Sequence, residues 1–135
     1  MKLSTRSRYG TRLMLDLAEH GLDKFVQLKD VSRRQGISLK YLEQIVIPLK
    51  KAKLLVSARG AGGGYRLARS PGEIRVGEIV ALLEGGNSIT RCTTKPETCD
   101  RAQSCLTRNL WIETADVLFG KLNSVTLSDL IKSKE

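Results

Sequence analysis

The sequence predicts a mainly α-helical fold with one small β-hairpin wing: a winged helix-turn-helix followed by a long dimerisation helix. Three observations support this prediction. Apolar residues recur at helical spacing over residues 5–20, 28–35 and 39–52. A glycine-rich segment at residues 59–64 separates two short apolar runs, a pattern typical of a hairpin. A long apolar-striped segment, residues 106–122, follows a polar loop.

The first helix is expected to begin after Ser4 or Thr5, whose hydroxyls can accept from free backbone N–H groups, and to end at Gly21. Phe25 and Val26 are expected to form a short strand.

The next two helices are separated by Gly36, and Ser38 can cap the second of them. Two short helices joined by a tight turn with glycine form a helix-turn-helix. The expected buried face of the helix at residues 39–52 consists of Leu39, Leu42, Ile45, Val46 and Leu49.

Strands are expected at residues 54–58 and 65–68, and a helix at residues 77–84. Thr126 is expected to begin a last short helix, with Asp129 as its capping-box partner. The apolar stripe of the long helix is one that a monomer could hardly cover: Leu106, Leu110, Val117, Leu118 and Leu122. We divide the chain into a DNA-binding domain (1–84), a cysteine-bearing sensor loop (85–105), and a dimerisation helix with a C-terminal cap (106–135).

The charge of the chain is unevenly distributed. The net charge is +9 over 135 residues. Residues 1–70 hold 15 Lys and Arg against 5 Asp and Glu, whereas residues 71–135 hold 8 against 9. A basic half suits a polyanion, and we expect that partner to be double-stranded DNA. The alternative is a basic protein with no specific partner.

No segment of the sequence predicts membrane association. No apolar run approaches the roughly 18 residues that span a bilayer. Arg6, Arg8 and Arg12 interrupt the apolar stretch that a secretory signal would need. We therefore expect a cytoplasmic protein whose three cysteines stay reduced.

Candidate DNA-binding residues lie at two places, the third helix and the wing. Glutamine can pair with adenine, lysine and serine can contact bases or phosphates, and Glu43 can accept from cytosine. Arginine is attracted to a narrow minor groove. The alternatives are a solvated helix face and a plain hairpin turn. The candidates are Ser38, Lys40, Tyr41, Glu43, Gln44, Arg59 and Gly60.

The three cysteines, Cys92, Cys99 and Cys105, cluster in one polar loop with the spacing C-x6-C-x5-C. Three soft thiolates suit an iron–sulfur cluster, zinc or copper(I). Zinc usually takes a fourth cysteine or histidine, and His20 is distant in sequence. Inert thiols are the alternative.

Short segments along nearly the whole chain give it a family resemblance. It resembles the IscR-like iron–sulfur cluster regulators of the Rrf-type family, winged helix-turn-helix transcription factors that also include nitric-oxide sensors. The segments are Met1-Lys2-Leu3-Ser4, Arg8-Tyr9, Gln35-Gly36-Ile37-Ser38, Tyr41-Leu42-Glu43-Gln44, Arg59-Gly60, Gly62-Gly63-Gly64-Tyr65, Val76-Gly77-Glu78, Arg91-Cys92, Cys105-Leu106-Thr107 and Leu110-Trp111.

The resemblance implies a homodimer built on the long helix. It also implies a cluster held by the three cysteines, with 2Fe–2S favoured over 4Fe–4S. DNA contact through Ser38, Tyr41, Gln44 and Arg59 is implied as well, and the residue matching Glu43 would gate which promoters are read.

The fourth cluster ligand departs from the family pattern. Arg108 stands where the cluster regulators have a histidine, and Arg8 stands where the nitric-oxide sensors have an acid. Asp100, Glu97, an acid of the first helix or an exogenous ligand remain as candidates.

The leading hypothesis is a DNA-binding regulator, a repressor that senses iron–sulfur cluster status and controls cluster-assembly genes. A second hypothesis keeps DNA binding but makes the cysteines a redox or nitric-oxide switch, or a zinc site. A third is a module that regulates through a protein partner. We do not expect an enzyme, because the residues offer no nucleophile, base and orienting group together.

Overall fold

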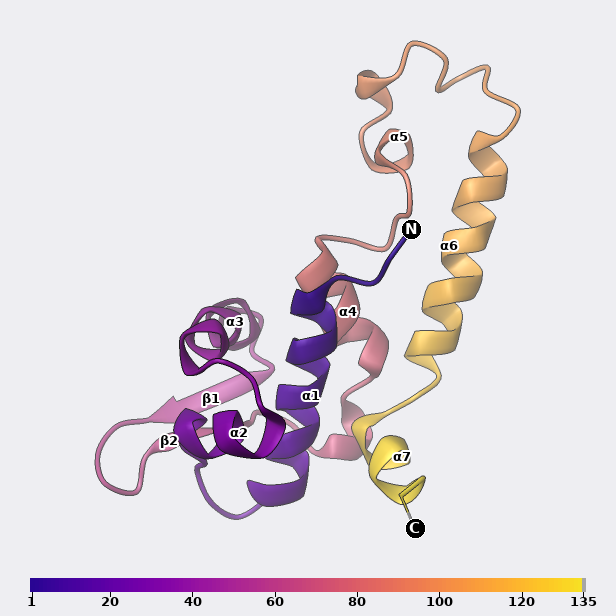
Figure 1. Cartoon of the computed structure of the whole chain (residues 1–135). Helices are drawn as coiled ribbons and strands as arrows, with labels where there is room; N and C mark the ends of the chain where they lie inside the picture. The colour runs from indigo at the N-terminus through magenta and orange to yellow at the C-terminus, as the bar shows by residue number, and fades with distance from the viewer. Residues whose placement is uncertain (135) are drawn as a thin grey trace.

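The computed structural model describes residues 1–134 and divides into a body and an arm (Figure 1). The body contains α1, α2, α3 and a hairpin, with α4 and α7 packed on it; α6 and the loop leading to it rise away as the arm. The helices are α1 (Thr5–His20), α2 (Leu28–Gln35), α3 (Leu39–Lys51), α4 (Val76–Glu84), α5 (Arg91–Thr94), α6 (Arg108–Asn123) and α7 (Leu127–Lys132). The strands are β1 (Leu55–Ala58) and β2 (Gly64–Leu67), and single 3-10 turns are η1 (Pro71–Glu73) and η2 (Pro96–Thr98).

The helix-turn-helix forms as the sequence predicts. The Ser4 hydroxyl accepts from the Ser7 amide at 3.0 Å and caps α1. Gly36 ends α2 in the left-handed conformation (φ 64°), which glycine adopts without a steric penalty. Four of the five expected apolar residues of α3 are buried; the expectation for Leu39 is wrong, because it lies in the first turn and is 40% exposed.

The wing is a two-stranded antiparallel hairpin in which Leu55 pairs with Leu67. The strand expected at Phe25–Val26 reduces to one bridge, in which Val26 and Tyr65 exchange two backbone hydrogen bonds of 2.8 Å. Gly64 is needed at this bridge, because a Cβ there would overlap the Val26 carbonyl. The hairpin is thereby joined to the segment that precedes α2.

α4 connects the body to the arm. A Cβ on Gly10 of α1 would overlap the Leu83 side chain, so glycine lets α1 and α4 approach closely. On its other side α4 packs on α6 through a small cluster of Val76, Val80 and Phe119. α7 then returns to the body, where Leu127 is fully buried in the main core.

The arm contains little core. Between Glu84 and Thr114 the side chains are exposed or half-buried except for Ala102. The expected start of the long helix is wrong by two residues, because α6 begins at Arg108 and Leu106 precedes it, 98% exposed. Across residues 1–134, no helix is both long and apolar enough to cross a membrane.

Candidate DNA-binding surface and cysteine loop

The first two turns of α3 bring five of the predicted DNA-binding residues together. Lys40, Glu43 and Gln44 are exposed, and none has a side-chain hydrogen bond or ion pair among the described residues. Ser38 is exposed as well, and its hydroxyl accepts from the Tyr41 amide at 3.3 Å. This end of α3 is therefore a surface with free amide, ammonium and carboxylate groups, which can contact base edges.

Tyr41 differs from its neighbours because its ring is half-buried. It packs edge-on against Tyr9 of α1, with ring centroids 5.7 Å apart. The guanidinium groups of Arg8 and Arg12 lie 5.9 and 5.5 Å from the centre of the Tyr9 ring. The start of α3 is thus held on α1 by aromatic packing, beside two arginines of α1.

The other two predicted residues, Arg59 and Gly60, lie at the exposed wing tip. α3 packs directly on β1, so the helix and the hairpin form one side of the body (Figure 1). Gly60 has a φ of 98°, a turn conformation that favours glycine. The structure therefore places the helix surface and the wing as neighbouring elements.

A buried ion pair that the sequence did not reveal fixes α2 against α1. Asp16 is 1% exposed and accepts from Arg34 at 2.7 and 3.0 Å and from Gln35 at 2.9 Å. Burial alone would raise the pKa of Asp16, but these hydrogen bonds outweigh it and leave the pKa below its ordinary value. An acid on the apolar face of α1 was the available signal, since buried carboxylates are almost always paired.

The cysteine loop carries three free thiols. Cys92 lies in α5, Cys99 follows η2, and Cys105 precedes α6; the first and third are half-buried and Cys99 is exposed. Within residues 1–134, no three His, Cys, Asp or Glu side chains are grouped as a metal site. The loop therefore carries three thiols that are not grouped as a metal site in the described part of the chain.

Cys105 lies at the N-terminal end of α6. Its Sγ is 3.2 Å from the Thr107 hydroxyl. That hydroxyl, together with the backbone N–H groups of Thr107 and Arg108, lowers the pKa of the Cys105 thiol. The thiolate is the form that binds metals.

Arg108 occupies the position where the resemblance predicts a histidine ligand. Its Nε is buried and has no hydrogen-bond partner among the described residues. A guanidinium offers no lone pair to a metal, because it is protonated at every physiological pH. Arg108 therefore cannot replace the histidine as a ligand.

The start of the cysteine loop is tied to the N-terminus of α1. Glu84, the last residue of α4, accepts from the Ser4 amide at 2.9 Å and from the buried Ser7 hydroxyl at 2.6 Å. The Ser4 and Ser7 side chains, together with the Ser4 amide, lower the pKa of Glu84. No local pattern predicts this contact, because the residues are 80 and 77 positions apart in the sequence.

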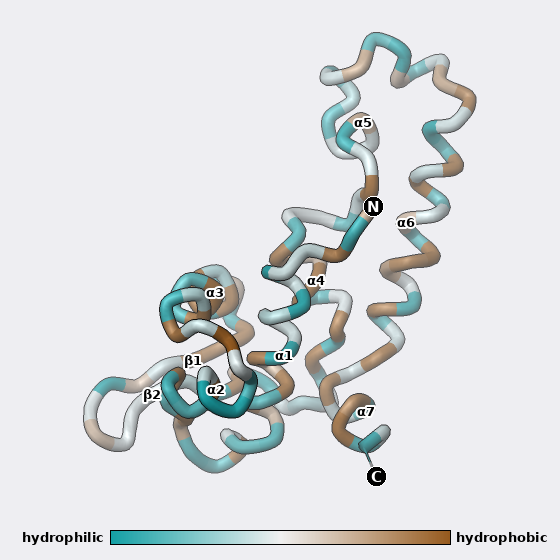
Figure 2. Tube along the Cα trace, in the orientation of Figure 1, coloured by the Kyte–Doolittle hydropathy of each residue, from teal (hydrophilic) through white to brown (hydrophobic). Residues whose placement is uncertain are grey.

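α6 presents an uncovered apolar face to solvent. Leu110 and Val117 are 52% and 74% exposed, and Trp111 and Leu118 are 37% and 41% exposed. Figure 2 shows hydrophobic residues recurring along α6, the helix that rises away from the body. The opposite face packs on the chain through Ala115 and Phe119. The chain therefore uses one face of α6 for its own core and leaves a second apolar face free.

A sequence profile of the Rrf2 family, described as "Iron-dependent Transcriptional regulator", matches residues 3–133. The chain belongs to the Rrf2 family. It is 47% identical to Protein rrf2 of Nitratidesulfovibrio vulgaris, over 98% of this chain and 88% of that protein. It is 42% identical to the HTH-type transcriptional regulator IscR of Pectobacterium carotovorum, over all of this chain and 82% of the relative.

Solved structures of Rrf2-family regulators have the same fold. The match to a structure of T. potens IscR spans all of this chain and 89% of the IscR chain, with a TM-score of 0.81 and 38% identity. CymR, titled the global cysteine regulator of B. subtilis, covers all of this chain and 99% of its own, with a TM-score of 0.80 and 37% identity. The prediction of a mainly helical winged-helix fold is confirmed, as is the family resemblance. This Rrf2-family member is a transcriptional regulator, and DNA binding is implied by the family.

Proposed function

We propose that the protein is a homodimeric repressor whose binding to DNA depends on an iron–sulfur cluster, and that it controls cluster-assembly genes. The observation that carries this proposal is the set of three free thiols, Cys92, Cys99 and Cys105, on one loop between α4 and α6. The family description names iron, and IscR is a named relative.

The chemistry of the loop fits such a cluster at three positions. Thiolates are the ligands that hold iron–sulfur clusters in proteins. The loop has few buried contacts to oppose closure around the cluster, since Ala102 is its one buried residue. We favour 2Fe–2S over 4Fe–4S on the family resemblance. The fourth ligand is not Arg108, which leaves Glu97, Asp100, an acid of α1 or an exogenous ligand.

DNA recognition is assigned to the exposed start of α3 and to the wing tip. The base-edge contacts are proposed for Ser38, Lys40, Glu43 and Gln44, with Tyr41 holding the helix on α1, and the minor-groove contact for Arg59 next to Gly60. A symmetric dimer reads two half-sites about one helical turn apart.

The test of the cluster is anaerobic reconstitution of the full chain with iron and sulfide, followed by absorbance and iron counting. Cys92→Ser, Cys99→Ser and Cys105→Ser should each lose the cluster, because too few soft ligands remain. Ser104→Ala is the control in the same loop and should keep it. A protein that takes up zinc but never iron and sulfide would contradict the cluster assignment.

The regulatory part is tested by comparing apo and reconstituted protein on the same operators. The apo and reconstituted forms must differ in affinity for at least one operator sequence. A cluster can regulate DNA binding only if the protein with the cluster and the protein without it bind DNA differently. Glu43→Ala should reduce the difference between operators. Equal binding of both forms to every operator would leave the cluster in place and remove its role in regulation.

The dimer is assigned to the uncovered face of α6, since a contiguous apolar surface of this kind marks an interface. Val117→Lys places a charge in that face and should give a monomer in analytical ultracentrifugation. Asn109→Lys adds the same charge on the polar side of α6 and should stay dimeric. A monomeric wild-type protein at micromolar concentration would refute the dimer.

A second candidate function keeps DNA binding and replaces the cluster with thiol chemistry. It is favoured by Arg108 at the fourth ligand position and by the separated thiols. Among the similar structures, CymR is titled a cysteine regulator, and one from Staphylococcus aureus is titled an oxidized form. The reconstitution test distinguishes the two, since this candidate predicts no uptake of iron and sulfide.

A further inference from the structure

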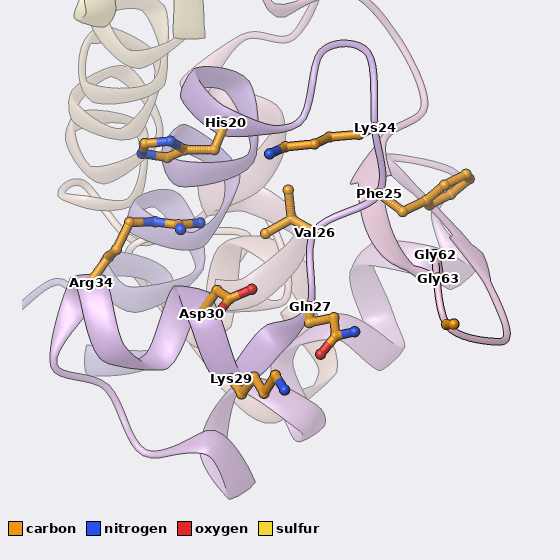
Figure 3. A pocket seen from close by; sticks show the side chains of 11 residues that line it. His20, Lys24, Phe25, Val26, Gln27, Lys29, Asp30, Arg34, Gly62 and Gly63 are labelled. Carbon is orange, nitrogen blue, oxygen red and sulfur yellow. The ribbon is translucent and has the colours of Figure 1, made fainter.

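A cleft of about 520 Å³ lies between the end of α1, the start of α2 and the wing tip. Its walls contain no residue of α3 or of the cysteine loop. Figure 3 shows the Lys24 side chain extending toward His20, with Arg34 on the same side and Gly62 and Gly63 of the wing across from them. The cleft is therefore distinct from the surfaces assigned above.

The cleft retains unpaired positive charge. Lys24 and Lys29 are exposed, and neither has an ion-pair partner within residues 1–134. The carboxylate in the wall, Asp30, is paired with Arg33 at 3.4 Å. Arg34, also in the wall, is paired with Asp16 at 2.7 Å. Two ammonium groups are left to attract an anion, with the His20 imidazole as a third nitrogen-bearing group.

The backbone around the cleft adds donors and space. α2 starts at the cleft, and its N-cap residue Gln27 makes no side-chain cap. The Asp30 amide donates to the Gln27 carbonyl at 3.0 Å, whereas the N–H groups of Leu28 and Lys29 have no hydrogen-bond partner within residues 1–134. A Cβ on Gly62 would meet no atom within 4 Å, so the wing tip leaves open space there. The Arg66 guanidinium lies 4.6 Å from the centre of the Phe25 ring, which lines the cleft on the side of the wing (Figure 3). Phosphate oxygens can be attracted by the ammonium group at either end of this cleft and can accept from the free N–H groups at its wall.

We propose that this cleft binds phosphate groups through Lys24 at one end and Lys29 at the other, as Figure 3 places them. The wall residues Ala61–Gly63 directly follow Arg59 and Gly60, so DNA bound by the wing brings its phosphodiesters close to the cleft. This source of the phosphate rests on the proposed DNA binding; inorganic phosphate is the other source. A phosphodiester in the cleft positions the duplex and adds affinity without reading sequence.

The first experiment measures the affinity of the protein for an operator and for random duplex DNA at several salt concentrations. In the double variant Lys24→Gln/Lys29→Gln both affinities should fall by the same factor. The log–log salt slope should become shallower by about 0.9 for each phosphate that is no longer neutralised. Lys132→Gln on α7 removes one positive charge outside the cleft. The single variants Lys24→Gln and Lys29→Gln should each reduce the affinity and the salt slope more than Lys132→Gln does. Because the three lysines are exposed, the variants should keep the wild-type circular dichroism spectrum.

The second experiment adds inorganic phosphate without DNA and follows the backbone amide resonances of Gln27, Gly62 and Gly63 by NMR. Saturable shifts in the wild type that vanish in the double variant identify free phosphate as a ligand. Loss of salt slope without such shifts identifies the DNA phosphodiester. If the variants change neither the DNA affinity nor the phosphate-induced shifts, the cleft proposal is overturned while DNA binding by the wild type stands. If the wild type binds no DNA, the proposed function fails, and the phosphate titration alone tests whether the cleft binds phosphate.

Discussion

The body and the arm of this chain differ in how much of their structure they determine themselves. In the body, α1, α2, α3, the hairpin, α4 and α7 share one continuous core. In the arm, residues between Glu84 and Thr114 bury only Ala102, and α6 contacts the chain through one face. Hydrophobic burial supplies most of the favourable free energy of folding, so the body is stable by its own contacts.

The proposed cluster and the proposed dimer contact both belong to the weakly packed part of the chain. A loop with few buried contacts opens and rearranges at low cost in free energy. The three thiols and the free face of α6 both lie in this region. Under the proposed function, the cluster and the second protomer act on this weakly packed arm, whereas the body presents α3 and the wing as a preformed surface.

The largest expected contrast comes from the same substitution made in each region. Leu42 is fully buried and Leu106 is 98% exposed. Leu42→Ala should lower the free energy of unfolding by about 3 kcal/mol, because it leaves a cavity. Leu106→Ala should change it by less than about 0.5 kcal/mol at dilutions where the protein is monomeric. Urea unfolding at two protein concentrations checks both; equal effects of the two substitutions would erase the contrast.

A smaller effect is expected from the buried ion pair of the body. Asp16→Asn leaves Arg34 without its anion. Since the Arg34 side chain is 28% exposed, the loss should be roughly 2 kcal/mol, below the range for fully buried pairs. Thermal unfolding with Glu113→Gln in the arm as control measures it. A loss no greater than that of the control would mean that the pair contributes nothing net.

The same ion pair predicts a direction of pH dependence. The pKa of Asp16 in the folded chain lies below its ordinary value of 3.8. Its contribution is therefore complete above the unfolded pKa and is lost as the pH falls below 3.8 through the folded pKa. The gap in stability between wild type and Asp16→Asn should close in this acid range. A gap that widens on acidification would contradict the assignment.

The smallest expected effects come from the caps of the last two helices. The Thr126 hydroxyl accepts from the Asp129 amide at 3.1 Å and begins α7, which packs on the body. Thr107 precedes α6 and makes no side-chain cap hydrogen bond. Thr126→Ala should cost about 1 kcal/mol in chemical unfolding, and Thr107→Ala should cost less. A reversed order would show that α6 contributes to the core more than its burial indicates.

Local signals in the sequence predicted most of the fold. Three hydroxyl side chains cap helices as expected, those of Ser4, Ser38 and Thr126. Gly36 ends α2 in the left-handed conformation that favours glycine. The errors are at Leu39, at the start of α6 and at Phe25–Val26, where one bridge stands in place of the expected strand. Periodicity assigns each residue to a face of its helix. It does not show that the first turn of a helix, such as the turn of α3 that contains Leu39, extends beyond the elements on which the helix packs.

The candidate site divides in the same way. The sequence by itself determined the residue types of the site: three cysteines in one polar loop, Arg108 in place of a histidine, and polar residues at the start of an amphipathic helix. Only the tertiary structure decided which groups meet. It brought Asp16 to Arg34 and Glu84 to Ser4 and Ser7. It placed Lys24, Lys29 and the wing tip around one cleft, and within residues 1–134 it left the three thiols ungrouped. Helical periods and caps depend on neighbours a few residues apart, whereas these contacts depend on how α1, α2, α4 and the hairpin pack together.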